Sequence, residues 1–427
     1  MKKKLLSFTL TLIMCLGLAV PASAHDMSKA GQKNIVSAGS YHTGLIDKNG
    51  SLWMWGTYKP IGNGLSKRAF VPAKVLDNVV SVSSGSNHTA AIKTDGSLWM
   101  WGSNNSGELG NGGIGNIHDS EGGIYQDVPV KVMDNVVSVS CGDGYTAAIK
   151  TDGSLWMWGA NNDMQLGNNG VGNVQDEIYG AYQTVPVKVL DNVVAVSCGS
   201  SHAAAIKTDG SMWWWGYEGV GVGFQDGTPS IGQSYQPVPV KVMDGVSAIS
   251  CGGSHTAAIK TDGSLWMSGS DNGWGQLGDS SSTEGKSPAD PIKVMDGVAA
   301  VSCGGSHTAA VKTDGSLWVW GSNEFGELGS SSGNAKVPYY NTVSASYDSF
   351  PVQTVPVKLM DGVSAISCGN SYTTIVKTDG SVWACGSNEV GKLGNNGKGN
   401  NSRDIGGYVI TMQTVPVKLP NITAKLK

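Results

Sequence analysis

The amino-acid sequence predicts an all-β protein, a seven-bladed β-propeller with four-stranded antiparallel blades. Glycine accounts for 61 of 427 residues, and tryptophan (14) outnumbers phenylalanine (5), which is typical of one tryptophan-bearing motif copied many times. One unit recurs with its hairpin glycines 46–65 residues apart, a period typical of solenoids and propellers. The seven units start near Ile35, Val79, Val136, Val193, Val246, Val298 and Val363.

The N-terminus has the pattern of an export signal, which we assign to residues 1–24. A run of lysines precedes a short apolar segment at 5–20, and Ala22-Ser23-Ala24 is a small-residue cleavage site. We therefore expect a bacterial protein that is secreted or displayed at the cell surface. Residues 25–427 should form a single propeller domain.

Each unit contains four segments of strand length, which we call strands A to D. In the third unit these are residues 136–140, 146–150, 154–158 and 185–189, in which apolar residues alternate or run together. Asp152-Gly153 between strands B and C is a strong signal for a tight hairpin.

The residues of strands A and D predict their places in the sheet. Strand A carries small residues on a valine frame, which suits a crowded centre. Strand D carries a proline that cannot donate to a sheet ladder, followed after one residue by a lysine, and both are typical of edges. We therefore place strand A at the axis and strand D outermost. The prolines are Pro72, Pro129, Pro186, Pro239, Pro291, Pro356 and Pro416.

Charge and hydropathy exclude several classes of protein. A net charge of −4 and a pI near 6.0 argue against binding to nucleic acid. Beyond the N-terminal segment there is no run of 18 apolar residues, so we expect no membrane span. We expect a monomer.

Histidine fills one position of the repeat in five units, and tyrosine fills it in the other two. A metal ring or a general base is one interpretation. The other is a side chain that closes the A–B turn by hydrogen bonding, which we favour because catalysis needs one asymmetric constellation. The residues are His42, His88, Tyr145, His202, His255, His307 and Tyr372.

Cysteine also repeats, in five units at the end of strand A. We expect these thiols and Cys385 to be free and buried, since copies in separate blades lie beyond bridging distance. No zinc-type spacing is present, and each Asp-Gly turn supplies a single carboxylate. The sequence therefore indicates no cofactor, no metal site and no catalytic residue. The five repeated cysteines are Cys141, Cys198, Cys251, Cys303 and Cys368.

The variable part of the repeat lies between strands C and D, at 111–127, 168–184, 217–236, 330–354 and 395–414. These insertions place tyrosines among Ser, Gly and Asn, which is typical of binding loops. In an antiparallel A-B-C-D sheet the A–B and C–D connections share one face. We therefore predict partner binding there, by Tyr125, Tyr179, Tyr182, Tyr235, Trp274, Tyr339, Tyr340, Tyr347, Phe350 and Tyr408. Variable surface loops without a function are the alternative.

The repeated motifs resemble those of the regulator of chromosome condensation repeat family. They are Cys-Gly-Gly-Ser-His-Thr-Ala-Ala-Ile at 251–259, Trp-x-Trp-Gly, and Asn-x-x-Gly-Glu-Leu-Gly at 104–110, and the resemblance covers 35–420. It implies a seven-bladed propeller. The namesake is a nuclear exchange factor, a role at odds with an export signal. The nearest analogy in compartment is a secreted bacterial relative, β-lactamase-inhibitory protein II.

The sequence therefore predicts a secreted scaffold, not an enzyme, that binds a macromolecule, which we expect to be a protein. Its partner, an extracellular protein or glycan, is not identified by any motif. An inhibitor of an extracellular hydrolase and an adhesive surface module remain alternatives. So does a glycan-active enzyme, for which the loop acids Glu121, Asp176, Glu177 and Asp226 are candidates.

Overall fold

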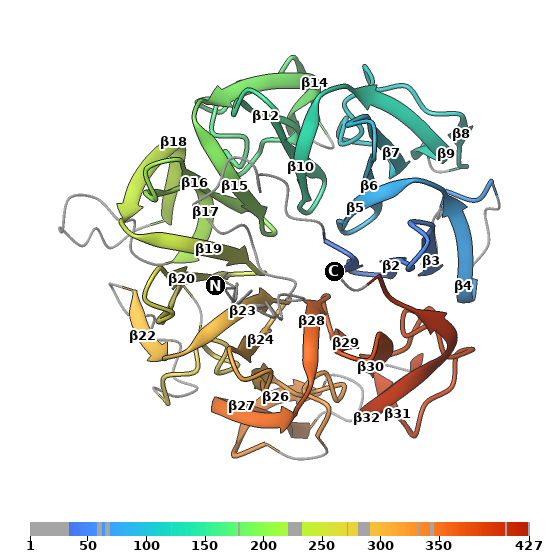
Figure 1. Cartoon of the computed structure of the whole chain (residues 1–427), viewed down its shortest axis with the longest axis vertical. Helices are drawn as coiled ribbons and strands as arrows, with labels where there is room; N and C mark the ends of the chain where they lie inside the picture. The colour runs from blue at the N-terminus through green and yellow to red at the C-terminus, as the bar shows by residue number, and fades with distance from the viewer. Residues whose placement is uncertain are drawn as a thin grey trace, which may run out of the picture.

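Seven β-sheets surround one axis in the computed structural model (Figure 1), as predicted. The structure describes residues 34–57, 62–64, 69–120, 122–177, 180–220, 233–270, 272–280, 291–330, 333–341, 346–405 and 408–425. The assigned signal segment, 1–24, lies outside these residues, so export stays a prediction. No helix in the described part of the chain is long and apolar enough to cross a membrane.

Every blade has the predicted order A-B-C-D, and all its strand pairs are antiparallel. Strand A is β1 (Val36–Ala38), β5 (Val79–Ser84), β10 (Val136–Cys141), β15 (Val193–Cys198), β19 (Val246–Cys251), β23 (Val298–Cys303) and β28 (Val363–Cys368). Strand B is β2 (His42–Ile46), β6 (His88–Lys93), β11 (Tyr145–Lys150), β16 (His202–Lys207), β20 (His255–Lys260), β24 (His307–Lys312) and β29 (Tyr372–Lys377).

The outer strands follow in the same order of blades. Strand C is β3 (Leu52–Gly56), β7 (Leu98–Ser103), β12 (Leu155–Ala160), β17 (Met212–Val220), β21 (Leu265–Gly269), β25 (Leu317–Ser322) and β30 (Ser381–Ser387). Strand D is β4 (Ala69–Leu76), β9 (Ile124–Met133), β14 (Gly180–Leu190), β18 (Gln233–Met243), β22 (Ile292–Met295), β27 (Ser346–Met360) and β32 (Tyr408–Thr423).

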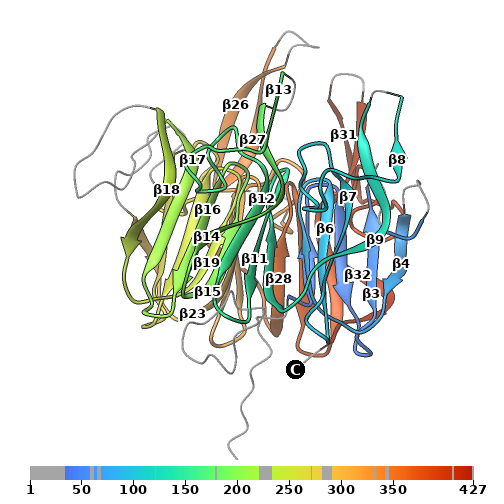
Figure 2. The same ribbon diagram turned by 90° about the horizontal axis from the view of Figure 1, so that it is seen from above.

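Four blades carry a fifth strand that the sequence did not predict. It is formed by part of the C–D insertion, which folds back on strand D and extends it as a hairpin. Figure 2 shows these hairpins rising from one end of the ring. The insertions are therefore partly strands rather than loops. The fifth strands are β8 (Ile117–His118), β13 (Val174–Asp176), β26 (Ala335–Asn341) and β31 (Asn401–Ile405).

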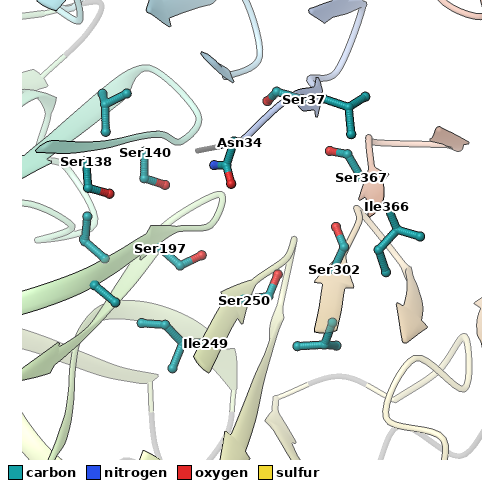
Figure 3. Close-up of a pocket in the computed structure, with 15 residues that line it drawn as sticks. Asn34, Ser37, Ser138, Ser140, Ser197, Ile249, Ser250, Ser302, Ile366 and Ser367 are labelled. Atoms are coloured by element: carbon teal, nitrogen blue, oxygen red, sulfur yellow. The ribbon is translucent and has the colours of Figure 1, made fainter. Parts of the chain in front are cut away.

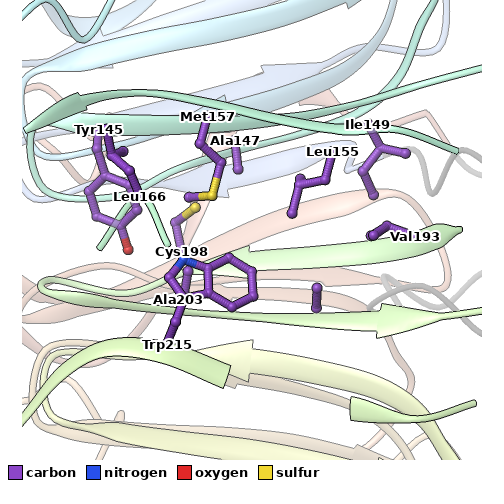
Figure 4. Close-up of a cluster of buried hydrophobic side chains, with 11 residues drawn as sticks. Tyr145, Ala147, Ile149, Leu155, Met157, Leu166, Val193, Cys198, Ala203 and Trp215 are labelled. Atoms are coloured by element: carbon purple, nitrogen blue, oxygen red, sulfur yellow. The ribbon is translucent and has the colours of Figure 1, made fainter. Parts of the chain in front are cut away.

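The tryptophans of strand C fill the space between blades. Between blades 3 and 4, Leu155 and Met157 of one sheet meet Val193 and Trp215 of the next (Figure 4). Trp213 and Trp215 point to the same side of the sheet, where Trp215 is fully buried and Trp213 partly buried against the neighbouring blade.

The Thr-Asp-Gly-Ser turns are hairpins held by their own side chains. Gly153 has a φ of 78°, which a residue with a side chain rarely adopts. Asp152 Oδ1 accepts hydrogen bonds from the backbone and the hydroxyl of Ser154, and that hydroxyl accepts the indole N–H of Trp156 at 2.8 Å. The turn aspartates are therefore structural, as predicted.

The C-terminus closes the ring beside the first blade. Ala424 pairs with Asp47 of blade 1, and its N–H donates to Gly380 O at 3.0 Å. In blade 2 the equivalent N–H belongs to Val79, the first residue of strand A, and donates to Gly50 O. Ala424 thus supplies the first residue of strand A in blade 1, and β1 supplies the rest.

Candidate partner-binding face

The axis is lined by strand A, and the described residues around its inner cavity carry no charge, whereas Asp143 lies at the axial opening formed by the A–B turns. Serines from several blades line a polar cavity of about 140 Å3 (Figure 3). A serine Oγ of each blade accepts the backbone N–H of the next blade at 2.8–3.0 Å, so seven hydrogen bonds form a closed ring. These serines are Ser37, Ser83, Ser140, Ser197, Ser250, Ser302 and Ser367.

The repeated histidines form a second ring, and their role is structural. His255 Nε2 lies 3.0 Å from Thr308 Oγ1 of the next blade, and Thr308 donates its own proton to Gln276 O. The threonine oxygen therefore accepts from His255 Nε2–H. Burial lowers the pKa of His255 to about 4, so its imidazole is neutral at pH 7. Tyr372 replaces histidine by donating to His42 O at 2.7 Å.

The glycine three residues before each histidine is required by this packing. A Cβ atom on Gly252 would lie 2.6 Å from Gly304 O of the next blade and 2.6 Å from the imidazole of His255. The Cys-Gly-x-x-His motif therefore encodes contact between blades, not metal binding. No group of three or more potential ligands in the described part of the chain could hold a metal ion.

The six cysteines of the described chain are free and buried, as predicted. Burial raises the pKa of the Cys141 thiol to about 12, and that of Cys368 likewise. Because the thiolate is the reactive form, both residues are unreactive at neutral pH.

The turn after strand C crosses from one blade onto the next. In blade 2 the side chain of Asn104 holds this turn by accepting the N–H of Leu109 at 3.0 Å. Glu108 O then accepts two hydrogen bonds from blade 3, from Trp158 Nε1 and Thr146 Oγ1, both at 2.9 Å. The Asn-x-x-Gly-x-Leu-Gly motif therefore caps the core tryptophan of its neighbour.

One position of this turn carries buried charges in three blades. Burial raises the pKa of the Glu108 and Glu327 carboxyls above the usual range. The third, Lys392, donates to Ser40 O across the closure at 3.4 Å, and burial lowers its pKa to about 8. These side chains lie under the face that we predict to bind.

The structure places the predicted tyrosines in different surroundings. Tyr125 in β9 is only 5% exposed, so it does not offer the contact surface expected of it. Tyr182 is half-buried in β14. Tyr235 is 42% exposed and stacks on Tyr217 with ring centroids 4.8 Å apart. Tyr179 lies outside the described residues.

The other four predicted tyrosines belong to projecting hairpins. Tyr339 and Tyr340 lie in β26, where Tyr340 pairs with Tyr347 across the hairpin. Tyr408 begins β32 and pairs with Ile405 of β31. The structure thus brings these residues to the end of the ring where we predicted the binding face.

Trp274 and Phe350 belong to a cluster that the sequence did not reveal. Phe350 is 5% exposed, and its ring lies 5.8 Å from that of Trp274 in blade 5. The Arg403 guanidinium of β31 lies 4.1 Å above the Phe350 ring, and its Nη1 is 3.8 Å from Glu324 Oε1. Three blades therefore meet here, and no repeat position signals that contact.

Of the four loop acids considered for catalysis, the structure describes Asp176 and Glu177. Glu121 and Asp226 lie outside the described residues, and Glu177 is exposed. Asp176 lies in β13, where its backbone pairs with Gly180.

Comparison with known proteins identifies the repeat. Residues 125–426 match the RCC1-like domain, and 49–92, 95–149 and 79–108 match the regulator of chromosome condensation (RCC1) repeat. The ultraviolet-B receptor UVR8 of Arabidopsis thaliana is 29% identical over 67% of this chain and 61% of its own length. The mitochondrial RCC1 domain-containing protein RUG3 of the same plant is 30% identical over 60% of this chain and 55% of its own.

Solved structures share the fold. Yeast RCC1 (Prp20), solved with Kap60, superposes with a TM-score of 0.66 at 20% identity, covering 98% of this chain and 91% of that one. Human WBSCR16 superposes with a TM-score of 0.62 at 21% identity, covering 84% of this chain and 96% of that one. The curated relatives above are matched over less than two thirds of their own length. With seven blades and a domain match over most of its length, the chain belongs to the RCC1-like domain family.

Proposed function

We propose that this protein is exported and acts as a protein-binding scaffold through the face formed by its C–D hairpins, hereafter the C–D face. The observation that supports this most is the difference between the two ends of the ring. One end repeats the same tight turn, Asp-Gly in six blades and Asn-Gly in the first, whereas the other bears hairpins of different length and sequence. A surface that varies while its scaffold repeats is typical of recognition.

The aromatic residues on this face support a protein partner. Tyr235 is exposed and stacked, and Tyr339, Tyr340 and Tyr347 lie in the hairpin of blade 6. Binding energy at protein interfaces usually resides in a few such anchors. Inhibition of an extracellular hydrolase would be one form of this function.

A catalytic role has less support. Glu324 and Glu327 are close in one turn, but Glu327 is 2% exposed and both of its oxygens are engaged. Oε1 accepts from Ser322 Oγ at 2.7 Å and Oε2 from Phe325 N at 2.8 Å. A carboxylate held in this way supports the turn and does not reach a substrate.

The test is affinity capture from the native extracellular medium with residues 25–427 as bait. Replacing Tyr339, Tyr340 and Tyr347 together by Ser should reduce capture of the partner at least about tenfold, since each interface anchor usually contributes about 2 kcal/mol or more. The matched control is Asp95→Asn with Asp152→Asn on the opposite rim, which should bind as the unmodified protein does. If only the control variant loses capture, the partner binds the rim of the Asp-Gly turns and not the C–D face.

A further inference from the structure

Glu324 departs from the role that its repeat position has elsewhere. In blades 2 and 3 the position holds Asn105 and Asn162, whose Oδ1 atoms accept the N–H of the residue that begins the outer part of strand D. In blade 6 that residue is Pro351, whose carbonyl accepts Asn323 N as its counterparts do but which has no N–H. Glu324 is thereby released from capping its own blade.

The carboxylate of Glu324 is left without a hydrogen-bond donor among the described residues. Its closest charged neighbour is Arg403 Nη1 at 3.8 Å, beyond hydrogen-bond distance, and the two side chains are 17% and 23% exposed. A half-buried carboxylate gains most when a donor is supplied, because charged hydrogen bonds are the strong ones. The carboxylate thus has a long ion pair with Arg403, accepts no hydrogen bond from a described residue, and is partly open to solvent.

The surroundings of this carboxylate suit a cation. Trp274 and Phe350 contribute aromatic rings, whose faces attract cations, and the Arg403 guanidinium over Phe350 shows that the site accepts one. Glu327 lies in the same turn and adds negative potential. The chain as a whole is also acidic, with a net charge of −4.

We propose that Glu324, at the edge of the cluster of Trp274, Phe350 and Arg403, is an anchor of the C–D face and receives a lysine or arginine side chain from a basic segment of the partner protein. This inference rests on the proposed function and specifies the chemistry of the partner. Arg403 is then a cation of this chain that shares the site with the partner's lysine or arginine side chain.

The charged groups facing Glu324 predict how the site responds to pH. Burial and the neighbouring Glu327 raise the pKa of Glu324 to about 7, and Arg403 of β31 opposes that shift. The carboxyl therefore becomes charged as the pH rises through neutrality. Binding of a cationic segment should strengthen between about pH 6 and 8.

The experiment uses residues 25–427 and a fluorescein-labelled peptide of alternating glycine and arginine, with the aspartate peptide as its counterpart. Fluorescence anisotropy should show binding of the arginine peptide only. Glu324→Gln should weaken it about tenfold or more, since a charged hydrogen bond is lost. The matched control is Glu389→Gln, which removes an exposed charge at the same repeat position of blade 7 and should change little.

Arg403→Gln tests the internal cation. Because it removes the competitor, it should tighten binding of the arginine peptide. Weaker binding by Arg403→Gln, equal losses in the two glutamate variants, or preference for the aspartate peptide would each overturn the proposal. Thermal melting of every variant confirms that it is folded.

These outcomes separate the two proposals. If the tyrosine variants lose the captured partner while Glu324→Gln keeps both partner and peptide binding unchanged, the C–D face binds but this anchor is wrong. If neither set of variants affects capture, the proposed function itself is wrong.

Discussion

His255 occupies a position that the seven blades fill with only histidine or tyrosine. Both side chains reach across to the next blade and are fully buried against the glycine that ends strand A. The repetition predicted a structural role, but the expected bond closed the A–B turn, whereas the observed bond reaches Thr308 of the next blade. Repetition does not reveal a residue that departs from its repeat position. The distinct surroundings of Glu324 could be recognised only from its tertiary contacts.

Replacing His255 by Ala should lower the free energy of unfolding by about 1–3 kcal/mol, because the bond to Thr308 is lost and buried polar groups are left unpaired. His255→Tyr should cost less, since Tyr145 and Tyr372 fit the same place over a glycine. Urea unfolding measures both. The control is His118→Ala on the exposed strand β8, which should be neutral. A His255→Ala variant that keeps its stability but loses partner binding would contradict the structural role.

Strands A to D could be predicted from the sequence because each is present seven times and the spacing of turns fixes its ends. The fifth strands could not, because they come from insertions that differ between blades and pair only through long-range contacts. Tyr125 and Phe350 were expected to be exposed, but strand D continues into the insertion and turns them inward. The cluster at Arg403 escaped prediction for a similar reason, since its members come from three blades.

The C-terminal segment completes strand A of the first blade, and its removal tests ring closure. Deletion of 421–427 removes the hydrogen bonds of Ala424 to Gly380 and Lys425 to Ile46, and uncovers the core beside Ile422. We expect a loss of about 3–5 kcal/mol in the free energy of unfolding, from these bonds and the apolar contact. Deletion of 426–427 alone is the control. Unchanged melting after the longer deletion would show that closure depends on other contacts.

The seven blades are joined by two circles of hydrogen bonds, hereafter belts, each of which passes through every blade. The serine belt joins neighbouring A strands, and the histidine–tyrosine belt joins the turns above them. Turns after strand C add a third set of contacts by capping Trp55, Trp158, Trp215 and Trp320 of the next blade. Because these bonds link every blade to the next, the C–D face is carried by a ring that is closed by hydrogen bonds.

The histidine belt predicts that the ring loses stability in mild acid. Burial lowers the pKa of its histidines to about 3 or 4, whereas the unfolded chain titrates near 6.5. The unfolded state therefore binds more protons between those values, so stability falls as the pH drops from about 6.5 towards 4. A pKa difference of this size corresponds to about 3–5 kcal/mol for one histidine, as an upper bound. The histidines are His42, His88, His202, His255 and His307.

Urea unfolding at a series of pH values between about 7.5 and 4.5 measures this effect. Glu108, Glu324 and Glu327 act in the opposite direction, because their pKa values are raised in the folded state, but they are outnumbered. The turn aspartates titrate below this window, since their pKa values lie under the usual range. His202→Tyr should remove one proton from the uptake that accompanies unfolding and flatten the slope accordingly. A free energy of unfolding that is level or rises towards pH 4.5 would mean that the histidines are not neutral within the ring.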